Sequence, residues 1–89
     1  MTPEKTLEVL NLHYRTLEHY PEQQLPDTLI NPSREQLLGH CKWMISQARV
    51  FVSEGRMDKA FRWLGFIQCG LFAGEIYNIA LLKEINRPQ

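Results

Sequence analysis

The sequence predicts an all-α fold whose core is an antiparallel helical hairpin at residues 34–74. Apolar residues recur between residues 37 and 51 at steps of four and three, which is the period of an amphipathic helix. Ser33 and Gln36 have the spacing of a capping box that opens such a helix. Gly55 supplies a residue suited to the left-handed end of a helix, and residues 56–58 form a short turn. A turn this short requires the two helices to lie antiparallel as neighbours.

An N-terminal helix on a proline-rich connector precedes the hairpin. Thr2 and Pro3 form a helix start, because a hydroxyl caps the first turn and proline is tolerated at the first helical position. We expect this helix to cover residues 1–19 and to end before Pro21. Its apolar stripe consists of Leu7, Leu10, Tyr14 and Leu17. Residues 20–33 hold three prolines and predict an irregular connector.

The two hairpin helices carry inner stripes that should face one another. The first stripe consists of Leu37, Cys41, Met44, Ala48 and Phe51. The second consists of Met57, Ala60, Leu64, Ile67 and Leu71. We expect Asp58 to cap the second helix and Gly74 to end it. A short C-terminal helix at residues 78–86 should follow, capped by Asn78, with inward-facing side chains at Ile79, Leu82 and Ile85.

The length of 89 residues accommodates one domain, residues 1–89, with a core that is small for its surface. The formal net charge is zero, but the charge is unevenly distributed. Residues 1–33 hold two basic and five acidic side chains, whereas residues 34–62 hold six basic and three acidic ones. The simplest interpretation is that an acidic arm folds onto a basic hairpin, either within one chain or across a dimer.

The cysteine content and the absence of a signal-peptide pattern predict a cytoplasmic protein with free thiols. The longest apolar stretch, residues 63–73, is too short to cross a bilayer. Cys41 and Cys69 should lie at the same height in the hairpin. However, Cys69 lies off the inner stripe, so we expect no disulfide.

Both hairpin helices carry apolar residues outside their inner stripes. Trp43 and Val50 are seven residues apart on a second side of the first helix, and residues 63–73 are apolar nearly all round. A helix that is apolar on two sides must be covered twice, either by the N-terminal helix or by another subunit or partner. Glycines spaced by four, at residues 70 and 74, permit close approach of another backbone. The candidate interface residues are Trp43, Val50, Trp63, Phe66 and Gly70.

Basic side chains gather on the same hairpin. They are Lys42, Arg49, Arg56, Lys59 and Arg62. They form either a solvated face or a patch for nucleic acid or an acidic protein. A neutral chain lacks the excess positive charge that drives phosphate binding, which favours the first interpretation.

No residue pattern points to catalysis, a cofactor or a metal. His13, His19 and His40 have no metal-binding spacing, and zinc needs about four convergent ligands. A site assembled from His40, Cys41 and Cys69 is the alternative to ordinary structural residues. The carboxylates are scattered, so no pair is positioned for acid–base chemistry. We expect no enzyme activity.

Two segments, residues 40–44 (His-Cys-Lys-Trp-Met) and residues 55–68 (Gly-Arg-Met-Asp-Lys-Ala-Phe-Arg-Trp-Leu-Gly-Phe-Ile-Gln), carry a family resemblance. They resemble a group of small uncharacterised proteins of tailed bacteriophages and prophages. The similarity covers about residues 36–87. The chain departs from the pattern at Cys69, where the family has glycine. The resemblance implies a phage protein in the cytoplasm of a bacterial host, and a role in binding host proteins.

Taken together, these features predict a non-catalytic protein-interaction module. We expect a homo-oligomer that modulates a host or phage protein. The alternative is an accessory protein that binds nucleic acid through the basic face of the hairpin.

Overall fold

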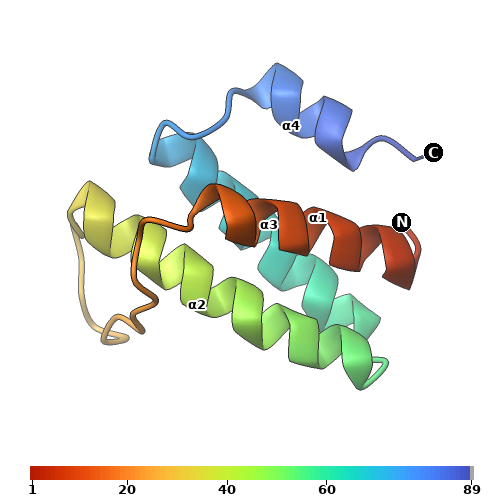
Figure 1. Ribbon diagram of the computed structural model, residues 1–89. Helices are drawn as coiled ribbons and strands as arrows, with labels where there is room; N and C mark the ends of the chain where they lie inside the picture. Colours follow the sequence, from red (N-terminus) through yellow and green to blue (C-terminus); the bar gives the residue numbers. More distant parts are fainter. Residues whose placement is uncertain (89) are drawn as a thin grey trace.

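The computed structural model describes residues 1–88 and is built from helices, with no strand in that range. The helices are α1 (Pro3–Thr16), α2 (Arg34–Ser53), α3 (Met57–Ala73) and α4 (Ile79–Asn86). Figure 1 shows α2 and α3 as an antiparallel pair, with α1 lying across them and α4 above the end of α3. The predicted all-α hairpin fold is therefore confirmed.

Local capping sets where the helices begin. The Thr2 hydroxyl accepts a hydrogen bond from the backbone N–H of Lys5 (3.1 Å), with Pro3 at the first helical position. Ser33 and Gln36 form the full capping box, with distances of 3.1 and 2.8 Å. Asn78 caps α4 in the same way through the N–H of Leu81 (2.8 Å). These three predicted helix starts are confirmed.

Three local expectations were wrong. Helix α1 ends at Thr16, earlier than predicted, because the chain tightens into a turn in which the Tyr20 N–H bonds to the carbonyl of Leu17. Asp58 does not cap α3: it lies in the first turn, and Arg56 occupies the cap position without a side-chain hydrogen bond. Ile79 faces outward and is exposed, because α4 touches the body along a different side.

The hairpin packs closely because glycines of α3 admit side chains of α2. A Cβ at Gly70 would overlap the Cys41 sulfur, and a Cβ at Gly74 would overlap the side chain of Leu38. Gly55 ends α2 with a φ of 76°, which is why glycine is suited to this turn. The fully buried core of the hairpin includes Leu38, Cys41, Ile45, Ala48, Ala60, Ile67 and Leu71.

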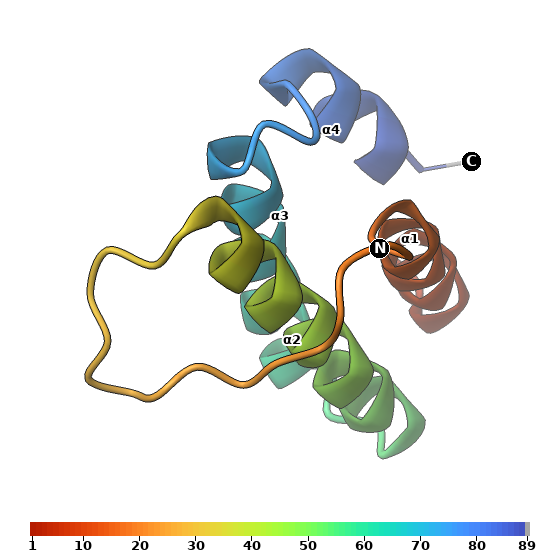
Figure 2. The same ribbon diagram turned by 60° about the vertical axis from the view of Figure 1, so that its left-hand side comes forward.

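The start of α2 is covered by the proline-rich connector. Figure 2 shows the connector leaving α1, passing across α2 and looping back to the start of that helix. The Gln23 N–H donates to the carbonyl of Gly39 (3.2 Å), and the Leu25 N–H donates to Nδ1 of His40 (3.0 Å). Gly39 is required here, because a Cβ would overlap the carbonyl of Pro21. The connector thus covers the second side of α2 at residues 39–40, which the sequence did not predict, whereas Val50 on the same side stays exposed.

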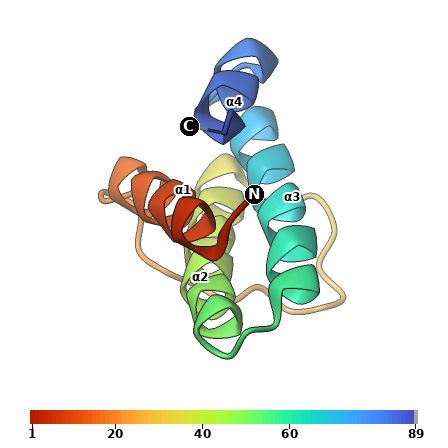
Figure 3. The same cartoon turned by 90° about the vertical axis from the view of Figure 1, so that its right-hand side faces the viewer.

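Helix α4 is attached through polar contacts as well as apolar ones. Figure 3 shows α4 crossing the end of α3 above α1, with both chain termini on the same side of the molecule. Gln68 of α3 and Asn86 of α4 exchange two hydrogen bonds (2.8 and 2.7 Å). Gln68 also lies 2.9 Å from Nε2 of the fully buried His13 in α1. The side chain of Gln68 thus links α1, α3 and α4. None of the helices described is both long and apolar enough to cross a membrane.

Candidate protein-interaction surface

An aromatic cluster spans the hairpin on the side away from α1. The rings of Trp43 and Trp63 lie 5.9 Å apart, one from each helix, and both side chains are half-buried. Phe51 meets Trp63 edge-on at 5.0 Å, and His40 stacks on Trp43 at 5.3 Å. We call these four residues the aromatic face. Such pairs stabilise the hairpin and leave ring surface available for a partner.

Cations border the aromatic face at the hairpin turn. The Lys59 ammonium lies 4.6 Å from the centre of the Phe51 ring and 6.0 Å from that of Trp63. Arg56 approaches the Phe51 ring at 5.1 Å, and the exposed Arg62 lies one helical turn beyond Lys59. The turn also forms a hollow of about 410 Å³. It is lined by Gly55, Arg56, Met57, Asp58, Lys59 and Arg62.

Two of the five predicted basic-patch residues lie elsewhere. Lys42 is only 8% exposed, and its ammonium donates to the carbonyl of Tyr20 (2.9 Å). Lys42 and Arg49 both lie over the ring of Tyr14, at 4.8 and 4.1 Å. The hydroxyl of Tyr14 donates to the carboxylate of Glu22 (2.6 Å), which also accepts from Ser46 (2.7 Å). The single basic patch of five residues was therefore wrong, because the N-terminal arm takes up two of its members.

This arrangement explains how the acidic arm meets the basic hairpin within one chain. The hydrogen bonds from Tyr14 and Ser46, together with the nearby charges of Lys42 and Arg49, hold the pKa of the Glu22 carboxyl below its usual value. The same hydrogen bond to Glu22 raises the pKa of Tyr14. Acidic and basic segments are thus matched locally, without a second subunit.

The remaining interface candidates have different environments. Phe66 is 57% exposed and Val50 is 48% exposed. Val50 lies two helical turns from Trp43 on the same side of α2. Gly70 is buried against Cys41 within the chain, so it offers no surface to another molecule.

The outward side of α3 is the apolar surface that sequence analysis described only in part. We call it the outer face, and every member is exposed. Its members are Phe61, Arg62, Gly65, Phe66, Cys69, Phe72 and Ala73. Phe61 and Phe72 are 38% and 48% exposed, and nothing lies within 4 Å of a Cβ placed on Gly65. The all-round apolar character of residues 63–73 predicted this surface, with Phe66 as its named interface candidate; Phe61 and Phe72 were not named.

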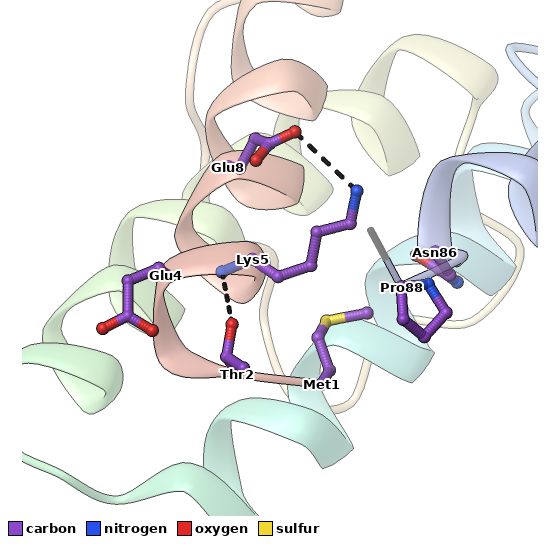
Figure 4. Close-up of a pocket in the computed structure, with 7 residues that line it drawn as sticks. All are labelled: Met1, Thr2, Glu4, Lys5, Glu8, Asn86 and Pro88. Atoms are coloured by element: carbon purple, nitrogen blue, oxygen red, sulfur yellow. Dashed lines mark hydrogen bonds and ion pairs between the residues drawn. The ribbon is translucent and has the colours of Figure 1, made fainter.

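Two further hollows lie apart from the hairpin turn, and the first borders the outer face at Phe66. One, of about 460 Å³, separates the connector from α2 and α3. It is lined by Leu25, Pro26, Asp27, Leu29, Pro32, Leu37, His40 and Phe66. The other, of about 340 Å³, lies between the start of α1 and the end of α4, where Lys5 reaches toward Glu8 (Figure 4). Neither hollow is lined by a pair of side chains arranged as a nucleophile and base or as an acid and base.

The titratable groups of the core are structural. Burial raises the pKa of the Cys41 thiol to about 11, so it stays protonated at neutral pH. His40 uses Nδ1 to accept from Leu25, and burial lowers its pKa. Both cysteines are free, as expected. Within residues 1–88, no group of histidine, cysteine or carboxylate side chains is arranged to hold a metal ion.

Comparison with protein-family models, with curated proteins and with solved structures found no match. The resemblance to small phage proteins therefore stays a prediction. The fold and the exposed surfaces carry the functional argument by themselves.

Proposed function

We propose that this chain acts without catalysis, by binding other proteins, with copies of itself among its partners. The observation that carries the proposal is the exposed apolar area of the hairpin. Phe66 is more than half exposed beside the half-buried Trp63, and Val50 extends the same apolar side of α2 beyond Trp43. Partly exposed tryptophans and phenylalanines are the residues that most often supply binding energy at protein interfaces.

The charges around the aromatic face favour an acidic partner. Arg56, Lys59 and Arg62 border the face, with Asp58 as the acidic residue among them. A protein surface that presents a carboxylate beside an apolar side chain would match both features. Charge complementarity of this kind speeds encounter and selects the partner. The resemblance to phage proteins supports a host or phage protein as that partner, in a bacterial cytoplasm.

The test is quantitative capture from bacterial lysate by the immobilised chain, read by mass spectrometry. We expect a partner whose capture falls at least about tenfold with Val50→Ser and with Lys59→Glu, because each removes one of the two features outside the outer side of α3. Ile79→Ser is the matched control, since Ile79 is exposed on α4, outside the hairpin that carries the aromatic face. A set of captured proteins that does not change among the four chains would contradict the proposal.

Nucleic-acid binding is the second candidate, and one observation favours it. Three exposed or half-exposed cations still converge on the hollow at the turn, as a phosphate would require. Two of the five predicted contacts are lost to Tyr14, and Asp58 lies within the hollow. This candidate requires a gel-shift that weakens steeply with salt. An absent shift at low salt excludes it.

A further inference from the structure

We infer that two copies of this chain pair through the outer faces of their α3 helices, antiparallel, with Cys69 at the two-fold axis. This inference rests on the proposed function, which includes self-association, and it specifies which surface performs it. The aromatic face of each subunit would remain available for a different partner. A second copy is the occupant that the pattern of α3 fits.

The first argument is the symmetry of the small residues. Gly65, Cys69 and Ala73 are spaced by four and form an exposed stripe along α3. The stripe is symmetric about Cys69, so an antiparallel copy sets Gly65 against Ala73 of the partner subunit. Small residues let two helices approach to the lower end of their usual spacing of about 8–10 Å.

The second argument is the position of the large residues. Phe66 and Phe72 lie three residues before and after Cys69, and both are exposed. An axis at Cys69 therefore brings Phe72 level with Phe66 of the partner subunit. The three exposed phenylalanines of the outer face would bury roughly 300 Å² per subunit. This is less than the roughly 800 Å² of a standard interface, so we expect a dimer of modest, concentration-dependent stability.

The third argument is charge. Arg62 is exposed and takes part in no ion pair or side-chain hydrogen bond among residues 1–88. With the axis at Cys69, the two copies of Arg62 lie 14 residues apart along the pair, or about 21 Å. A parallel pair would instead set Arg62 beside Arg62 and align the two helix dipoles, which is unfavourable. Like-charge repulsion and the helix dipoles therefore favour the antiparallel arrangement.

The pairing is tested by oxidative crosslinking. Helices whose axes are about 8–10 Å apart place facing Cα atoms about 3.4–5.4 Å apart, which reaches the range in which a disulfide closes. Diamide, which takes up two electrons and two protons from two thiols, should give a covalent dimer in the parent chain and in Cys41→Ser. Cys69→Ser should give none, and neither should Cys69→Ser with Val50→Cys, which moves the thiol off the outer face. Equal crosslinking of the last variant would contradict the inference.

Removing the Arg62 charge separates the two orientations. By sedimentation velocity, Arg62→Gln should leave the dissociation constant of the dimer nearly unchanged, because the two copies of Arg62 lie far apart in an antiparallel pair. A parallel pair predicts that Arg62→Gln strengthens association, because it removes a like-charge contact, and that result would overturn the antiparallel assignment.

A glycine variant separates the interface from the fold. Gly65→Leu should weaken the dimer at least about tenfold, because a side chain would block the close approach. Its helix content and resistance to urea should not fall, since nothing in the monomer lies near that Cβ. If the dimer persists in Gly65→Leu and in Phe72→Asp, this inference fails while the proposed function stands. If the parent chain is monomeric at all concentrations, the self-association part of the proposed function fails as well.

Discussion

Gly70 of α3 lies directly against the thiol of Cys41 in α2, so closely that a Cβ at residue 70 would overlap the sulfur. The Cys41 thiol also approaches the carbonyl of Ile67 (3.8 Å). This contact fixes the distance between the two hairpin helices. Gly70 thus serves packing within the chain, as Gly74 does against Leu38, whereas Gly65 faces outward with open space around it.

Gly70→Ala should therefore destabilise the fold. Overpacking a close contact lowers the free energy of unfolding by about 1–3 kcal/mol. Urea unfolding followed by circular dichroism measures the change. Cys41→Ala should recover part of the loss in the double variant, because it removes the overlapping sulfur. An unchanged midpoint in Gly70→Ala alone would show that the helices can move apart freely.

Gly65→Ala should have the opposite effect. Alanine is favoured over glycine inside a helix by about 0.5–1 kcal/mol, and an added Cβ meets no atom within 4 Å. The midpoint of urea unfolding should rise at a protein concentration low enough to keep the chain monomeric. A loss of stability would indicate that residue 65 has a packing role that the structure lacks.

Lys42→Met should destabilise the chain without affecting partner capture. The buried ammonium of Lys42 bonds to the carbonyl of Tyr20, and a hydrogen bond to a charged group contributes about 1.5–3 kcal/mol. Methionine keeps the apolar stem but leaves that carbonyl unpaired. Lys59→Met is the comparison, since we expect reduced capture with little change in stability. The reverse pattern would place Lys42 back in the binding surface.

Stability should fall as the pH falls from 6.5 to about 4. Burial lowers the pKa of His13 from 6.5 to about 4, so between these values the unfolded chain binds a proton that the folded chain does not. The loss reaches about 3 kcal/mol at the lower end, at 1.36 kcal/mol per pKa unit. His40 acts in the same direction, because burial lowers its pKa as well.

Urea unfolding at several pH values measures this slope. His13→Gln should flatten it, because glutamine keeps a polar group near Gln68 but does not titrate. A slope that is equally steep in that variant would assign the pH dependence to other groups.

The parts of the fold that follow local rules could be predicted from the sequence. The caps at Thr2, Ser33 and Asn78 each depend on atoms within four residues, and all three form. The hairpin follows from the helical period and Gly55. The prediction that Asp58 caps α3 was wrong because aspartate favours the first turn of a helix as well as its cap position.

The parts that depend on distant segments could not be predicted. Lys42 and Arg49 appear on α2 as an ordinary basic face. They are removed from it by Tyr14, which α1 brings from 28 and 35 residues away. Gly39 was a missed signal: a glycine inside a strong helix pattern marks a close backbone approach, here by the connector. The exposure of the outer face depends on where α4 packs: it bonds to α3 through Gln68, which lies outside that face.

Sedimentation velocity of the unmodified chain, from about 1 µM to about 1 mM, tests the central claim most directly. The exposed phenylalanines of the outer face predict a mass that rises from one chain toward two across this range. A single species with the mass of one chain at every concentration would contradict self-association through these surfaces.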